Sequence, residues 1–245
     1  MAGWTLQFLN DLHGSLAAVS DAVDASKRIG DRRSELVSLT CMLMLQYELG
    51  NMNDAPASIE HLQGLAELHG AKAWVPMTGY IRAQYHETVG QHQLAIEEIE
   101  RNLEMMRETS AGFQGPRMLG YFAMLIDDPI ARRNALLEAE TMLRDGAVGH
   151  NHLAFYRFAI DACLRSNDWD GAEKYAAALE DFTASEPLPS SNLIIARGHA
   201  LANHGRGKRD QATLQELTRL RDEVERIGLK SVLPALTEAL ATMQA

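Results

Sequence analysis

Cysteine is scarce in this sequence, which contains two, Cys41 and Cys163, among 245 residues. Both lie within segments expected to be helical and far apart in the chain, so we interpret them as small buried apolar side chains rather than a disulfide or metal site. The longest apolar runs, such as residues 118–126, fall well short of the roughly 20 residues that a membrane span requires. The N-terminus lacks a basic stretch followed by an apolar one, so no signal peptide is expected. These absences predict a cytoplasmic protein without membrane contact.

Positive charge is also in short supply. The chain has 23 Lys and Arg against 33 Asp and Glu, a formal net charge of −10. An acidic protein repels phosphate backbones over long range unless one face is strongly basic. The compact basic cluster at residues 206–209 is interpreted as a solvated interhelical loop. We therefore expect no nucleic-acid partner.

Motifs that carry chemistry are missing as well. Residues 205–208 resemble a phosphate-binding loop superficially, but Arg209 stands where Ser or Thr is needed and no strand precedes them. Asp127 and Asp128 are interpreted as a helix cap rather than a magnesium site, because Ala131 stands where a third carboxylate would be required. The histidines lack zinc-ligand spacing, and no nucleophile motif can be recognised. We expect no catalytic residues, no metal and no cofactor.

Helical periodicity is what the sequence does contain. Residues 153–164 and 172–182 carry apolar side chains at helical spacing, and a tight turn at 166–168 separates them, with Asp168 expected to cap the second helix. Turn signals recur every 36 to 40 residues, at Gly14, Gly50, Gly90, Asp127, Asn167 and Gly205. Such a period is typical of stacked helix pairs. No segment alternates with period two over a strand's length, so we predict no sheet.

These patterns predict an all-α fold, a right-handed α-solenoid of about six helix hairpins with a C-terminal capping helix. We expect one domain, residues 1–245. The expected repeat units are residues 1–30, 31–70, 71–112, 113–149, 150–187 and 188–228, with the capping helix at 229–245. Gly30 is expected to end a helix in the left-handed conformation. Pro116 is expected in the first helical turn of the fourth unit.

Two surface features follow from the same pattern. In the third unit, Ala95, Ile99, Leu103 and Met106 are expected to point inward. The charged residues Glu97, Glu98, Glu100, Arg101 and Glu104 are expected to form a solvated outer face, with Glu97 and Arg101 paired. In the first unit, Trp4 and Phe8 would be exposed without an upstream neighbour. We therefore expect either that the chain is part of a longer protein or that its N-terminal repeat packs on a second copy as a homodimer.

The spacing of small residues around the turns resembles that of tetratricopeptide repeats. It is carried by Gly90 and Ala95, by Asn167 and Ala172, and by Gly120 and Gly198 before their turns. The period here is nearer 40 than the family's roughly 34 residues, and the family's aromatic and proline positions are mostly absent. More narrowly, residues 150–207 resemble the C-terminal helical repeat region of bacterial multidomain signalling proteins that join a class III nucleotide cyclase domain to an ATPase module. The resemblance implies a regulatory or sensing segment rather than the enzyme, since neither domain is present in the chain.

In tetratricopeptide-like proteins the ligand lies against the first helix of each pair, which implies a concave binding face here. The implied residues are Thr40, Met44, Tyr80, Gln84, Arg117, Tyr121, Arg157, Asp161, Arg165, Asn192 and His199. Arg157, Asp161 and Arg165 are spaced by four, on the side of their helix opposite the apolar one. Local salt bridging on a wet surface is the simpler interpretation of each single residue.

We expect a non-catalytic module that binds a protein or peptide through this face. One alternative is a hydrolase or lyase that uses Asp161, His199 and Tyr121. Another is an oligomerisation spacer.

Overall fold

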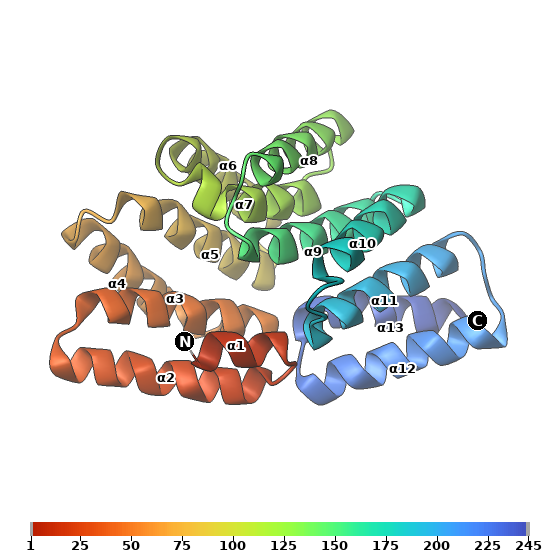
Figure 1. Ribbon diagram of the computed structural model, residues 1–245, viewed down its shortest axis with the longest axis horizontal. Coiled ribbons are helices and arrows are strands. Elements are labelled where there is room, and N and C mark those ends of the chain that lie inside the picture. Colours follow the sequence, from red (N-terminus) through yellow and green to blue (C-terminus); the bar gives the residue numbers. More distant parts are fainter. Residues whose placement is uncertain (1, 244–245) are drawn as a thin grey trace. The chain divides into compact units, whose positions relative to one another are not determined.

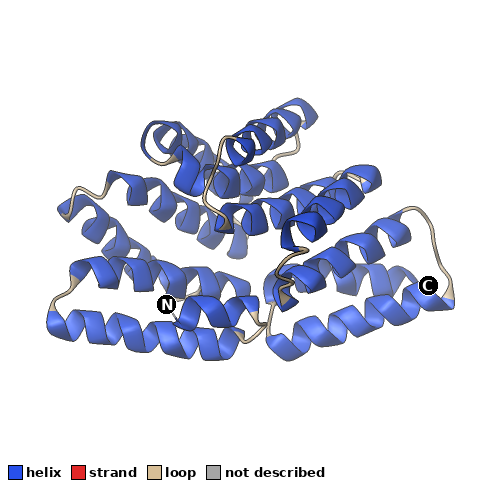
Figure 2. Ribbon diagram, in the orientation of Figure 1, coloured by secondary structure: helices blue, strands red, loops and turns tan. Residues whose placement is uncertain are grey.

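The computed structural model describes the backbone of residues 2–243 and the side chains of residues 5–243. In this range the chain consists of α-helices, two short 3-10 turns and connecting loops, without a strand (Figures 1 and 2). The predicted all-α class is therefore confirmed. Contacts divide the chain into two compact units, Met1–Ser110 with Ile227–Ser231, and Ala111–Arg226 with Val232–Ala245.

Unit 1 contains six helices. They are α1 (Ala2–Phe8), α2 (Leu12–Ile29), α3 (Arg32–Glu48), α4 (Ala55–Leu68), α5 (Val75–Thr88) and α6 (His92–Thr109). Each helix packs on the next one in the chain, and α3 also contacts α5. The segment 227–231 belongs to this unit, where Ser231 donates a hydrogen bond to Glu48 of α3. Phe8 is half-buried, and the Trp4 side chain lies outside the described residues.

Unit 2 contains the remaining helices. They are α7 (Ala111–Leu125), α8 (Pro129–Arg144), α9 (His150–Arg165), α10 (Trp169–Thr183), α11 (Pro189–Gly205), α12 (Gln211–Ile227) and α13 (Leu233–Met243). From α7 to α11 each helix packs on the next, and α9 contacts both α7 and α11 (Figure 1). The helix α13 falls within the expected C-terminal segment and packs on α11.

Short polar residues set the helix ends. The Asp168 carboxylate accepts a hydrogen bond from Gly171 N at 2.9 Å, as predicted, and Gly30 ends α2 with φ of 73°. The predicted turn at Gly14 is wrong, because Gly14 lies in the first turn of α2 and donates its N–H to Asp11 Oδ1. The chain reverses at Asn10, which adopts φ of 61°. Asparagine tolerates this left-handed conformation, which is why no glycine is needed there.

The expected position of Pro116 in a first helical turn is also wrong. The helix α7 begins at Ala111, and Pro116 lies inside it. Proline has no N–H to donate to the carbonyl four residues earlier, which is that of Gly112. That carbonyl instead accepts Val148 N at 3.0 Å, and the Phe113 carbonyl accepts the Asn151 side-chain amide at 2.9 Å. Val148, just before α9, thus satisfies the Gly112 carbonyl that the proline leaves open, and Asn151 of α9 adds a bond to the next carbonyl.

Two glycines mark the places where α7 and α11 approach α9. A Cβ at Gly120 of α7 would lie 3.2 Å from Phe158 Cβ, and one at Gly198 of α11 would lie 3.1 Å from Ile160 Cγ2. Both distances are tighter than ordinary packing allows. These two glycines therefore permit the close approach of α7 to α9 and of α9 to α11.

Candidate functional site

The residues implied for the concave face occupy different environments in the two units. In unit 1, Thr40, Tyr80 and Gln84 are buried. The Thr40 hydroxyl donates to the Leu36 carbonyl at 2.8 Å, and the Gln84 amide donates to the Tyr80 hydroxyl at 2.8 Å. The structure places these three side chains in the core, where a partner at the surface would not reach them. Met44 is half-buried.

The helix α7 buries both of its implied residues, Arg117 and Tyr121. Every residue from Gln114 to Leu125 is buried, and the Tyr121 ring meets the Phe158 ring edge-on at 5.3 Å. Burial and the nearby Arg117 guanidinium together lower the pKa of His150 to about 4, so this imidazole is neutral near pH 7. The positive charge of Arg117 would repel a protonated His150, so the neutral form of the imidazole is favoured. The sequence interpretation set His150 aside with the other histidines, because they lack zinc-ligand spacing.

Asp161 is part of a buried ion pair rather than a wet surface. Its Oδ1 lies 2.5 Å from Nη1 of Arg197 on α11, and the side chains are 11% and 4% exposed. The expectation that Asp161 faces away from the packed side of α9 is therefore wrong. The helix α9 packs against α11 as well as α7, and Asp161 lies where α11 approaches.

Arg197 is the functional candidate that sequence reasoning missed, although a signal existed. Arg117, Arg157 and Arg197 are spaced by 40 residues, and they lie on α7, α9 and α11. These are the helices that contact one another in order along unit 2. Counting by this spacing would have selected Arg197 rather than His199 on α11.

Partly open positions remain on α9 and α11. Arg165 and Asn192 are exposed, while Arg157 and His199 are half-buried. We call these four residues the α9–α11 polar set. The Arg157 guanidinium lies 5.5 Å from the centroid of the Phe158 ring. His199 is close enough to Glu173 of α10 to contribute to the lowered pKa of that carboxyl, which mainly reflects a hydrogen bond from Arg206.

The three residues of the alternative catalytic grouping each have a different neighbour. Asp161 contacts Arg197, Tyr121 packs on Phe158, and His199 lies beside Glu173. Within residues 5–243, no group of three or more His, Cys, Asp or Glu side chains is arranged to hold a metal ion. In residues 2–243, no helix has both the length and the hydropathy needed to cross a bilayer.

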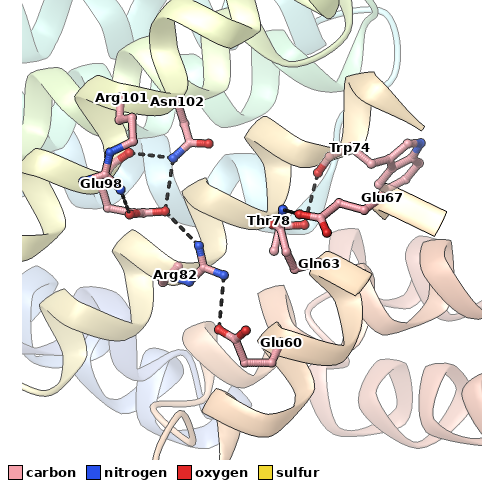
Figure 3. A network of polar contacts seen from close by, with 9 residues as sticks. All are labelled: Glu60, Gln63, Glu67, Trp74, Thr78, Arg82, Glu98, Arg101 and Asn102. Atoms are coloured by element: carbon pink, nitrogen blue, oxygen red, sulfur yellow. Dashed lines mark hydrogen bonds and ion pairs between the residues drawn. The ribbon is translucent and has the colours of Figure 1, made fainter. Parts of the chain in front are cut away.

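Unit 1 contains a polar network that links α4, α5 and α6 (Figure 3). Arg82 of α5 donates to Glu98 of α6 at 3.0 Å and to Glu60 of α4 at 3.3 Å. Glu98 also accepts from Arg101 at 2.8 Å and from Asn102 at 3.2 Å. Glu98 is buried, so the expected solvated face of α6 is wrong at this position.

The ion-pair partner of Arg101 also differs from the expected one. Arg101 pairs with Glu98 rather than Glu97, because Arg82 and Asn102 hold the Glu98 carboxylate on the inner side of α6. A Cβ at Gly79 of α5 would lie 2.1 Å from the Asn102 side chain. This glycine is therefore needed for α5 and α6 to approach.

The comparisons with known proteins add no family. No family model matches the chain. No curated protein matches it either.

Proposed function

We propose that the chain is a tetratricopeptide-like α-solenoid that binds a protein or peptide through the first helices of its pairs. Contact between α7 and α9, and between α9 and α11, supports this architecture, as does the contact of α3 with α5 in unit 1. Stacking of first helices in chain order is how helical repeat proteins build a continuous surface for an extended partner. The resemblance of residues 150–207 to signalling proteins makes a regulatory module our preferred context.

The observation that carries this proposal is that Arg117, Arg157 and Arg197 recur every 40 residues on three helices that contact one another. Arginine and tyrosine are enriched among the residues that dominate binding energy at protein interfaces. The buried members, Arg117 and Arg197, contribute to packing. The accessible members of the α9–α11 polar set are the residues that we expect to contact a partner.

Affinity capture with matched variants tests the proposal. The test variant replaces Arg165 and Asn192 with Ala, which removes the two exposed side chains of the set. The control replaces Arg33 and Asn134, an exposed arginine and an exposed asparagine on α3 and α8, with Ala. Both variants lose one positive charge. We expect the test variant to capture specific partners about tenfold less than the wild-type chain does. The control should capture them as the wild-type chain does. Equal capture by both variants would refute a binding role for this set.

A further inference from the structure

Three aromatic side chains of unit 2 form a partly exposed surface at one end of α9 and α10. The imidazole of His152 stacks on the Phe182 ring, with centroids 4.2 Å apart and an interplanar angle of 3°. His152 also lies 6.0 Å from the Tyr156 ring. Phe182 is 40% exposed, and the other two are half-buried. We call His152, Tyr156 and Phe182 the α9–α10 aromatic surface.

Carboxylates of α8 and α10 contribute to the electrostatics of this surface. Burial is the main cause of the raised pKa of Tyr156, and the charges of Glu140 and Asp181 add to it. Burial lowers the pKa of His152, so its ring is uncharged near pH 7 and does not repel a cation.

The C-terminal end of α10 is electrostatically unbalanced. Glu180 and Asp181 lie in its last turn, Glu186 follows shortly after, and this turn contains no basic residue. The negative end of a helix dipole favours cations and disfavours carboxylates. All three carboxylates belong to exposed residues. A cation supplied by another molecule would relieve this repulsion.

Lys174 of α10 shows how a cation can lie against both an aromatic ring and a carboxylate in this unit. Its ammonium lies 4.5 Å from the centroid of the Tyr175 ring and 2.7 Å from Glu140 Oε1. The positive charge thus sits between a ring face and a carboxylate. A ring face attracts a cation through its quadrupole, and the nearby carboxylate adds direct attraction.

We propose that the α9–α10 aromatic surface binds an arginine side chain from a basic segment of a partner protein. A planar guanidinium can stack on the exposed Phe182 ring and is attracted by the carboxylates at the end of α10, and a lysine ammonium cannot stack in the same way. The net charge of −10 favours approach of a basic segment. This surface shares no residue with the α9–α11 polar set, so the inference goes beyond the function proposed above and does not rest on it.

Fluorescence anisotropy with a labelled nona-arginine peptide tests the inference on the full chain. The test variants are Phe182→Leu, which removes the ring but keeps an apolar side chain, and Asp181→Asn. The matched controls are Phe113→Leu, at a phenylalanine that is 38% exposed, and Glu100→Gln, at an exposed carboxylate of α6. Circular dichroism checks that all four variants remain helical.

We expect Phe182→Leu and Asp181→Asn each to weaken binding of the peptide by about two- to fivefold. Both controls should change its affinity by less than about 1.5-fold. A nona-lysine peptide should bind more weakly than nona-arginine. Equal losses in the test and control variants would mean attraction by net charge alone and would overturn the proposal. Displacement of the peptide by tetramethylammonium at concentrations where guanidinium has no effect would assign the surface to a quaternary ammonium and would also overturn it. Because the α9–α11 polar set is unaltered in these variants, the result is independent of the affinity-capture test.

Discussion

Removing the carboxylate of Asp161 should destabilise unit 2 strongly. The Arg197 side chain is 4% exposed and lies 2.5 Å from Asp161. In an Asp161→Leu variant the guanidinium would stay buried without its counter-ion. Breaking a buried pair in this way costs about 3–5 kcal/mol, whereas an exposed pair contributes about 0–1 kcal/mol.

The double variant Asp161→Leu/Arg197→Met separates the ion pair from the packing around it. Replacing both partners with apolar side chains of similar size removes the uncompensated charge. We expect its free energy of unfolding to lie within about 2 kcal/mol of the wild-type value. The double variant should therefore recover at least about 1 kcal/mol of the stability that Asp161→Leu alone loses.

Urea unfolding followed by far-UV circular dichroism measures these free energies. Arg219→Met serves as the control, because Arg219 forms exposed pairs with Glu216 and Glu223 within α12. It should cost less than about 1 kcal/mol. A cost below about 1 kcal/mol for Asp161→Leu would show that Asp161 and Arg197 are solvated, and the reasoning would fail.

Three further predictions use other contacts of the structure. Gly79→Ala should destabilise the protein by about 1–3 kcal/mol in urea unfolding, because the added Cβ would overlap the Asn102 side chain; an unchanged midpoint would argue against this approach of α5 and α6. Asn151→Ala should cost about 1–3 kcal/mol, because it removes the buried Asn151 amide and its hydrogen bond to the Phe113 carbonyl, and a change within about 0.3 kcal/mol would contradict that bond. The pKa of His150 is lowered from 6.5 to about 4, so between these values the unfolded chain binds a proton that the folded chain does not. Stability should therefore fall by about 2 kcal/mol as the pH drops through this window, and His150→Gln should lose that part of the dependence; identical pH profiles would refute it.

Local features of the fold were predictable from the sequence because they depend on a few neighbouring residues. The Asp168 cap and the left-handed Gly30 follow from residue type and position alone. The all-α class follows from helical periodicity and from the absence of alternating segments. The turn near residues 10–14 was misplaced because Asn10 took the conformation that glycine usually takes.

Features that depend on a third helix could not be predicted from one helix at a time. Glu98 looked like part of a solvated face, but Arg82 from α5 and Asn102 hold it inside. Pro116 looked like a helix start, but Val148 donates its N–H to the Gly112 carbonyl that the proline leaves open. In each case the missing information was a partner distant in the sequence.

The candidate site shows the same limit in a different form. Counting back from the turns identified Arg117 and Arg157 but selected His199 on the last of the three helices. The 40-residue spacing identifies Arg197 instead, which the structure pairs with Asp161. Whether a residue implied for the concave face is buried depends on how closely a neighbouring helix such as α11 approaches it. The sequence contains no direct measure of that distance.

The central claim is that first helices of successive pairs pack on one another in chain order. Nuclear Overhauser effects in a fully protonated, 13C- and 15N-labelled sample measure this contact directly at the two glycines. The account predicts cross-peaks from the Gly198 α-protons to the Ile160 methyl groups and from the Gly120 α-protons to the Phe158 side chain. If both sets are absent while the intrahelical cross-peaks of α7, α9 and α11 remain, the helices form without this stacking and the account is contradicted.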